Sequence, residues 1–220
     1  RDTILSSVTV NDSLSFTFSD SINWTTLQSQ SIVAWTELPN DMNRYNDTLE
    51  IQVDYLNSTL QAVPLAQNFD TFNSCSTAND CGATICTLGS GWLNLSNQTS
   101  DDIDWRVNSG PTASSNTGPS SDVSSSGKYI FLESSGSCNN QRAVLLSPCI
   151  NLVNTTSPEL SFNYHMYGAS IGSLTVDVFN GQYWQSVFSK SGDQGNSWNL
   201  ETIDLSIYTG DIIIVRFSGT

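Results

Sequence analysis

Apolar and polar side chains alternate with a period of two along much of the chain. In the clearest example Leu160, Phe162, Tyr164 and Met166 alternate with polar or amphipathic neighbours. Such alternation puts the apolar side chains on one face of a β-strand. The same pattern predicts further strands at residues 14–19, 31–37, 48–55, 174–178, 203–207 and 213–217.

Segments between the predicted strands are rich in Gly, Ser, Asn and Pro, as at 108–122 and 191–197, and predict turns and surface loops. No segment carries a sustained apolar stripe with helical spacing. The sequence therefore predicts an all-β protein, built as a sandwich or a jelly roll.

A short Pro-containing link at 63–67 separates two parts of the chain, and a new aromatic segment starts at Phe69. The three or four strands expected before the link are too few to close a sandwich. We therefore expect one unit over residues 1–62 and a second over residues 63–220.

Composition narrows the function. Apolar residues make up 38% of the 220 residues, which is enough for a core, and 21 acidic against 7 basic residues give a net charge of −14. Binding to nucleic acid, or to a membrane through a polybasic patch, needs clustered Lys and Arg. The seven basic residues of this chain form no such cluster in the sequence, so both modes of binding are excluded. Apolar runs such as 212–215 fall far short of the roughly 20 residues that span a bilayer, and no leader-like segment opens the chain. We expect no direct membrane insertion and a trimmed, secreted or cell-surface protein.

Five cysteines, at 75, 81, 86, 138 and 149, favour an oxidising compartment. Zinc binding is the weaker interpretation, because the Cys spacing does not match zinc motifs and His165 is the only histidine. We expect a Cys138–Cys149 disulfide and one more among the first three cysteines. The odd thiol is either free or bonded to a residue outside the fragment.

The first part of the chain resembles a known module. The run from Ala34 to Asn43, followed by Asn46, Asp47 and Thr48, is similar to the closing strands of a CARDB-like immunoglobulin-type module from bacterial surface proteins. This resemblance implies that residues 1–62 are the C-terminal part of an Ig-like β-sandwich.

The second part carries a longer ordered set of motifs. These are Phe69-Asp70, Gly91-Trp92, Asp101 to Trp105, Gly118 to Asp122, Gly127 to Tyr129, Leu146 to Pro148, Leu160 to Gly168, Gly172 to Leu174, Trp184, Gly192 to Gly195, Trp198 and Val215 to Phe217. In this order they resemble a MAM domain, and its bacterial branch more than its animal one. The resemblance implies a two-sheet jelly roll used for adhesion or as an accessory module, and not a catalyst. Its closing strand is missing here and the cysteine pattern differs, so we expect a slice of a longer multidomain protein.

Catalytic motifs are missing from the sequence. His165 lies in a predicted strand with no nucleophile elbow near it, and the zinc-peptidase motif H-E-x-x-H does not occur. A pair of glycosidase carboxylates stays open, since sequence alone does not give their separation. We predict that the fragment is not an enzyme.

The segment Asp101 to Trp105 places three carboxylates within four residues. It is either a solvated loop or a site for a hard cation such as calcium. The family resemblance favours a structural calcium site and nominates Asp70, Asp102, Asp104 and Asp122. A second acidic run, at 41–47, is interpreted as a turn.

Exposed aromatics can serve as platforms for sugars, but Tyr183, Trp184 and Trp198 are better interpreted as packing residues. Seven N-x-S/T triplets occur, beginning at Asn11, Asn23, Asn46, Asn57, Asn94, Asn97 and Asn154. Three further triplets resemble the D-[ST]-aliphatic motif at which Bacteroidetes O-glycosylate exported proteins. They nominate Thr3, Ser13 and Thr48 as glycosylation sites.

These observations predict a non-catalytic adhesion or stalk segment of a large secreted or cell-surface bacterial protein. The expected partners are an extracellular glycan or protein ligand, or neighbouring β modules of the same chain. The alternative is an accessory binding module of a secreted hydrolase, such as a protease or a glycosidase.

Overall fold

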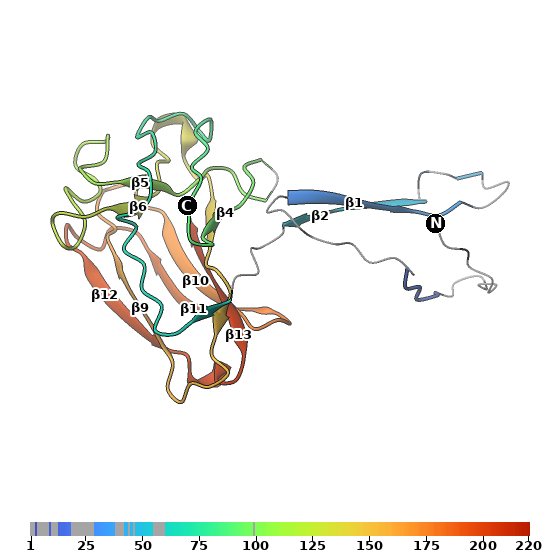
Figure 1. Ribbon diagram of the computed structural model, residues 1–220. Helices are drawn as coiled ribbons and strands as arrows, with labels where there is room; N and C mark the ends of the chain where they lie inside the picture. The colour runs from blue at the N-terminus through green and yellow to red at the C-terminus, as the bar shows by residue number, and fades with distance from the viewer. Residues whose placement is uncertain are drawn as a thin grey trace. The chain divides into compact units, whose positions relative to one another are not determined.

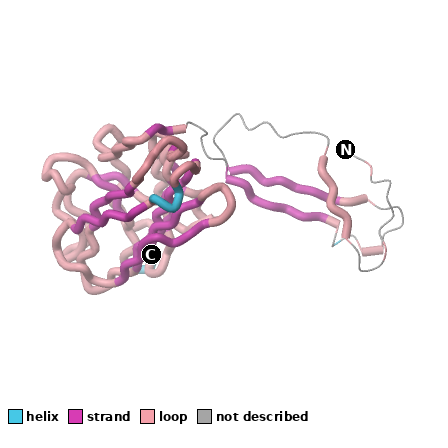
Figure 2. Tube along the Cα trace, turned by 90° about the horizontal axis from the view of Figure 1, so that it is seen from below, coloured by secondary structure: helices cyan, strands magenta, loops and turns pink. Residues whose placement is uncertain are grey.

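The computed structural model describes residues 3, 9, 13–18, 29–37, 42, 43, 45, 47–54, 60–98 and 100–220 (Figure 1). The chain divides into two compact units, Arg1–Tyr55 and Leu56–Thr220. The secondary structure described is β-strand with short 3₁₀ turns, as the alternating pattern predicts (Figure 2). No helix among the described residues has the length and apolar content needed to cross a bilayer.

The described residues of the first unit form one antiparallel ladder, β1 (Ser29–Trp35) with β2 (Thr48–Asp54), in which Ile32 faces Ile51. Both strands agree with the predicted ones. The strand predicted at 14–19 is wrong over the described residues 13–18, which form none. Phe16 and Phe18 instead stack edge to face on each other at 5.5 Å. Alternation places the apolar side chains on one face of a segment, but it does not provide a neighbouring strand. Without a neighbouring strand to accept and donate backbone hydrogen bonds, no ladder forms.

The second unit contains all the other strands. They are β3 (Gln61–Ala62), β4 (Leu93–Asn94), β5 (Arg106–Asn108), β6 (Tyr129–Phe131), β7 (Ala143–Leu146), β8 (Ile150–Asn151), β9 (Glu159–Tyr164), β10 (Ser173–Phe179), β11 (Trp184–Ser191), β12 (Asn199–Asp204) and β13 (Ile212–Gly219). The main sheet has the order β11-β10-β13-β7-β4, with β8 beside β13 and β3 beside β8. The boundary predicted near residue 63 is too late, because β3 pairs with β8 and so belongs to this unit.

Two short ladders, β9 with β12 and β5 with β6, complete the second unit (Figure 1). Leu160 and Phe162 of β9 pack on a core that includes Val176 and Val178 of β10, which are fully buried. Burying one such side chain contributes about 1.5–3 kcal/mol. The period-two pattern of β9 thus places its apolar face against the main sheet.

One predicted strand ends early. The segment predicted at 203–207 leaves the ladder at Asp204 and continues as a 3₁₀ turn, Ser206–Tyr208. This turn buries Leu205 and Tyr208 and leaves Ile207 exposed. The alternation was therefore misleading over its last residues, where the backbone changes period.

The predicted Cys138–Cys149 disulfide is wrong. Cys138 is bonded to Cys81 and Cys75 to Cys86, while Cys149 is free. Cys138 is buried at the end of the 3₁₀ turn Gly136–Cys138, and its Cα lies 5.1 Å from that of Cys81. Strand β7 follows this turn and carries the chain away from it, so Cys149 packs with an apolar cluster elsewhere. The second predicted disulfide, among the first three cysteines, is confirmed.

Arg106 holds the disulfide-bonded loop against β5. Its guanidinium is almost fully buried, donates to the carbonyl oxygens of Ser76 and Ala78, and pairs with the carboxylate of Asp80. Burying a guanidinium is costly unless its donors have partners, and this loop supplies partners for both Nη atoms. The loop between Cys75 and Cys86 is therefore fixed at its ends by sulfur and at its centre by Arg106.

Candidate functional site

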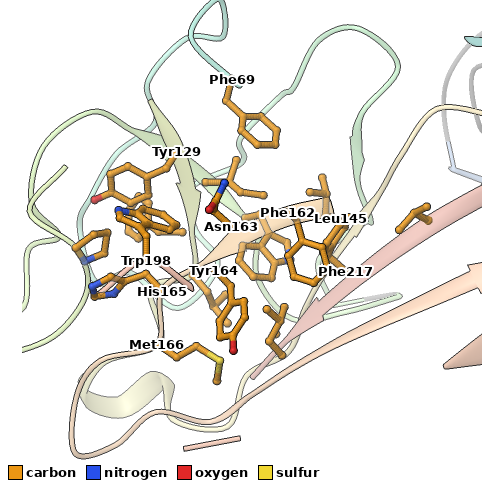
Figure 3. Close-up of a pocket in the computed structure, with 18 of the residues that line it drawn as sticks. Phe69, Tyr129, Leu145, Phe162, Asn163, Tyr164, His165, Met166, Trp198 and Phe217 are labelled. Atoms are coloured by element: carbon orange, nitrogen blue, oxygen red, sulfur yellow. The ribbon is translucent and has the colours of Figure 1, made fainter. Parts of the chain in front are cut away.

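A groove of about 1240 Å³ lies in the second unit. Strands β6 and β9 both line it, and its apolar floor includes Leu145 and Phe217 (Figure 3). Within the described residues β9 pairs only with β12, and β6 only with β5. Each strand therefore has one edge whose backbone N–H and C=O groups have no strand partner.

Aromatic rings close one end of the groove. Trp198 packs edge to face on Tyr129 at 5.8 Å and on His165 at 5.5 Å, as Figure 3 shows. The indole N–H of Trp198 donates to the carbonyl oxygen of Ser121 at 3.0 Å. These contacts agree with the interpretation of Trp198 as a packing residue.

His165 is held in place rather than poised beside a nucleophile. Its Nε2 lies 3.1 Å from Oδ1 of Asn196, and its Nδ1 is buried without a partner. Burial lowers the pKa of His165, and the contact with Asn196 opposes that change in part. The neutral imidazole is therefore the favoured form near neutral pH.

The other two predicted aromatics lie on β11 or just before it. The guanidinium of Arg216 lies 4.1 Å from the ring centroid of Trp184 and also pairs with Asp177 at 3.0 Å. Trp184 is thus used in a cation–π contact. Tyr183 is more than half exposed and remains accessible to a ligand.

Two of the four predicted calcium ligands meet at Gly127. A Cβ on this glycine would lie 2.5 Å from Oδ1 of Asp70 and 2.9 Å from Oδ2 of Asp122, so both carboxylates converge there. The N–H groups of Gly127 and Ser124 donate to Asp122, and that of Lys128 donates to Asp70. Burial is the largest single influence on the pKa of Asp122 and raises it, but hydrogen bonds from Ser124 and nearby N–H groups together outweigh burial and lower the pKa. Both side chains are suited to a cation.

Asp102 and Asp104 do not join that pair. Oδ2 of Asp102 accepts from the N–H of Arg142 at 2.8 Å, and Oδ2 of Asp104 accepts from that of Cys86 at 2.5 Å. Among the described residues no group of three or more His, Cys, Asp or Glu side chains is placed to hold a metal. The predicted set of four is therefore split between loops, because backbone N–H groups hold each carboxylate where it is.

Asp101 is a residue that the sequence did not single out as a ligand. It is 7% exposed, and its Oδ2 accepts from the N–H of Val144 at 2.7 Å. Burial raises the pKa of Asp101 to about 7, which the N–H of Val144 opposes and the charge of Asp104 increases. Burial also raises the pKa of Asp104. The signal available in the sequence was the DDID run itself, but its pattern does not tell a buried carboxylate from a solvated one.

The predicted O-glycosylation positions Thr3, Ser13 and Thr48 are all exposed. Asp2, Ile4 and Asp12 of the same triplets lie outside the described residues. Among the N-x-S/T triplets, Asn94 uses its amide on Trp105 and Cys86, Asn97 donates to Gly82, and Asn154 is exposed. The triplets at Asn11, Asn23, Asn46 and Asn57 begin outside the described residues.

Comparison with known proteins gives one family. The model of the MAM domain family, described as MAM domain, meprin/A5/mu, matches residues 69–220. Human MAM domain-containing glycosylphosphatidylinositol anchor protein 1 is 36% identical over 116 residues, which cover 48% of this chain and 12% of that protein. Neuropilin-1a of Danio rerio is 33% identical over 99 residues, or 43% of this chain and 11% of that protein. The chain thus spans about an eighth of these curated relatives.

Among solved structures, the K1 cleaved adhesin domain of Lys-gingipain from Porphyromonas gingivalis W83 is similar with a TM-score of 0.40 and 16% sequence identity. The match covers 60% of this chain and 83% of that one.

Proposed function

The chain belongs to the MAM domain family, and from that premise we propose that it is a non-catalytic binding module that acts in extracellular adhesion. The observation that carries the proposal is the family match, which covers nearly all of the second unit. Two disulfides support an oxidising, extracellular location. A protein ligand or a glycan outside the cell is the proposed partner.

The surroundings of His165 support a role in binding rather than in catalysis. General-base chemistry needs an imidazole within hydrogen-bond reach of the proton it removes. Here the accessible nitrogen lies against Asn196, and the ring is stacked among Trp198 and Tyr167. These contacts favour a histidine that orders the end of the sandwich.

The finer assignment is that this is a bacterial-type module of a long surface protein, preceded by the end of a CARDB-like unit. The motifs from Ala34 to Thr48 and the D-[ST]-aliphatic triplets support it. The β1–β2 ladder is compatible with the closing hairpin of such a unit.

The groove is proposed to accept one more β-strand of the parent polypeptide. Its two bounding strands, β6 and β9, each have one edge without a strand partner, and its floor is apolar. A strand with alternating apolar side chains would satisfy both edges and cover Phe217. The smaller ladders would then become one continuous sheet.

A calcium ion is proposed to bridge Asp70 and Asp122. The convergence of both carboxylates on Gly127 supports this site, and the surrounding N–H groups keep the oxygens oriented. Calcium takes six to eight oxygen ligands, so carbonyl or water oxygens would complete the shell. The ion would hold the start of the unit to the 122–128 loop.

The native parent protein tests the functional proposal. Its mass and flanking peptides should place further β modules beside this one, and the isolated chain should show no turnover of casein, peptidoglycan or polysaccharides. A catalytic domain next to it would favour the accessory role in a hydrolase. Turnover by the isolated chain that a single carboxylate-to-amide change abolishes, with the fold intact, would refute the proposal.

A further inference from the structure

Two loops of the second unit meet around a small buried set of oxygen atoms. The loop that carries Gly82 and Cys86 is fixed by both disulfides, and the turn from Ser96 to Trp105 packs on it. The approach is close: a Cβ on Gly82 would lie 2.5 Å from the carbonyl oxygen of Asp102. Side chains at this contact are therefore shielded from water on both sides.

Two of these oxygens have no hydrogen-bond donor among the described residues. Oδ1 of Asp101 and Oδ1 of Asn97 are both buried without a partner. A buried acceptor without a donor is costly, and native proteins rarely keep one without a water or an ion beside it. Two such atoms on one turn, at residues that pair in an isolated β-bridge, point to a species that binds there.

Turning the amide of Asn97 over does not remove the problem. Its Nδ2 donates to the carbonyl oxygen of Gly82 at 3.2 Å, and its side chain also hydrogen-bonds Asp104. The reversed amide would place an oxygen against those two acceptors. Oδ1 must therefore face away from them and stay available.

Negative charge gathers at the same place. Asp101 and Asp104 are 7% and 2% exposed, and the charge of Asp104 bears on Asp101. The charges of Arg142 and Arg106 offset those of Asp101 and Asp104 in part. The two Nη atoms of Arg106, however, are committed to Asp80 and two carbonyl oxygens. Burying two carboxylates without a direct cationic partner is costly, and a bound cation removes that cost.

From these contacts we infer that a hard cation, calcium by its preference for oxygen, binds between the two loops through Oδ1 of Asp101 and Oδ1 of Asn97, with the charge of Asp104 close by. The site is separate from the Asp70–Asp122 pair and shares no residue with it. The backbone N–H groups of Val144 and Cys86 hold the two carboxylates in position, so the ligands are preorganised. The ion would secure the turn 96–105 to the disulfide-bonded loop.

Titration calorimetry with calcium chloride, on the 220-residue chain freed of metal with EDTA, tests the inference. We expect two binding events, one at each proposed site. Asp101→Asn should weaken one of them at least tenfold, and Asp122→Asn should leave that same event within twofold. Loss of that event in Asp122→Asn alone, or no effect of Asp101→Asn, would assign the calcium to the other pair and overturn the inference. No calcium binding at all would indicate a water or a proton on Asp101 and would overturn it too.

A second variant covers the case in which Asp101→Asn fails to fold. Asn97→Asp adds a carboxylate beside the proposed ion, so the difference in Tm between calcium and EDTA should grow by several degrees. If no ion binds there, the third buried carboxylate lowers Tm equally with and without calcium. That result would count against the site on its own.

Discussion

The β1–β2 ladder of the first unit and the β9–β12 ladder of the second are two-stranded, antiparallel and built from alternating residues. In the first, Leu49 and Ile51 share one face of β2 and are 62% and 46% exposed. In the second, Phe162 of β9 lies edge to face on Phe188 at 5.2 Å and on Phe217 at 5.4 Å. The same sequence pattern thus produced an open face in one unit and a covered one in the other.

The difference teaches what a period of two encodes. It encodes the direction of side chains relative to the ladder, because successive residues point to opposite faces. It does not encode whether another layer covers the apolar face, since that depends on segments distant in sequence. Stability should therefore be concentrated in the second unit, and four measurements can break or sharpen this contrast.

The largest effect should come from the long disulfide. Cys81→Ser with Cys138→Ser opens a covalent loop with a sequence separation of 57, which should lower the free energy of unfolding by about 4 kcal/mol through unfolded-state entropy. The first unit contains no cysteine and should be unaffected. Urea denaturation followed by tryptophan fluorescence measures both. Cys149→Ser, at the free thiol, is the matched control, and an equal loss there would refute the assignment.

Next comes a matched pair of leucines. Leu145 is fully buried, so Leu145→Ala should cost about 3 kcal/mol by leaving a cavity. Leu49 is largely exposed on β2, and Leu49→Ala should change stability by less than about 0.5 kcal/mol. Chemical denaturation of both variants gives the comparison. Similar costs would mean that an unseen layer covers the first hairpin.

A smaller effect is expected at the cation–π contact. Arg216→Lys keeps the charge but loses the planar stacking on Trp184 and should cost about 1 kcal/mol. Glu37→Gln, at an exposed contact with Trp35 in the first unit, serves as its counterpart and should cost nearly nothing. Thermal unfolding monitored by circular dichroism compares them. A neutral Arg216→Lys would show that the contact adds no stability.

The smallest effect should be the pH dependence due to His165. Burial lowers its folded pKa below the unfolded value of about 6.5, so its stabilising contribution is complete above that pH and is lost as pH falls below it. The raised pKa of Asp101 has the opposite effect, because its contribution to stability falls as the pH rises from about 4 to 7. The histidine contribution is therefore the difference between wild type and His165→Gln over pH 5–7. Parallel curves for the two proteins would exclude it.

Much of the fold could be predicted because the alternation of apolar and polar residues in a strand is visible within a short stretch of sequence. β2, β9, β10 and β13 lie close to their expected positions, and the MAM resemblance gave the family and the jelly-roll class. The failures share a cause, which is dependence on distant partners. Residues 14–18 alternate as a strand would, but they pair with no strand among the described residues. Cys138 is bonded to Cys81, which is 57 residues away in the sequence, and their proximity depends on the folded structure.

The candidate sites were less predictable for a related reason. Four aspartates were expected in one shell, yet only Asp70 and Asp122 converge. Asp104 is drawn to the N–H of Cys86, and Asp101 to that of Val144. Backbone donors compete for carboxylates, and their positions appear only when the strands and the disulfide-bonded loop are placed. The sequence therefore identified aspartates as the candidate ligands but could not show which of them lie close together.

The Cys81–Cys138 bond also has a mechanical meaning. When a chain is pulled at its two ends, a disulfide transmits the force directly between its two cysteines. The residues between those cysteines are therefore not stretched. At about 3.4 Å per extended residue, the separation of 57 residues withholds roughly 190 Å of contour length from stretching. Strands β4, β5 and β6 and both acidic loops lie within that shielded length. Even if force unfolded strands β9 to β13, residues 81–138 would stay linked by the disulfide and would not extend.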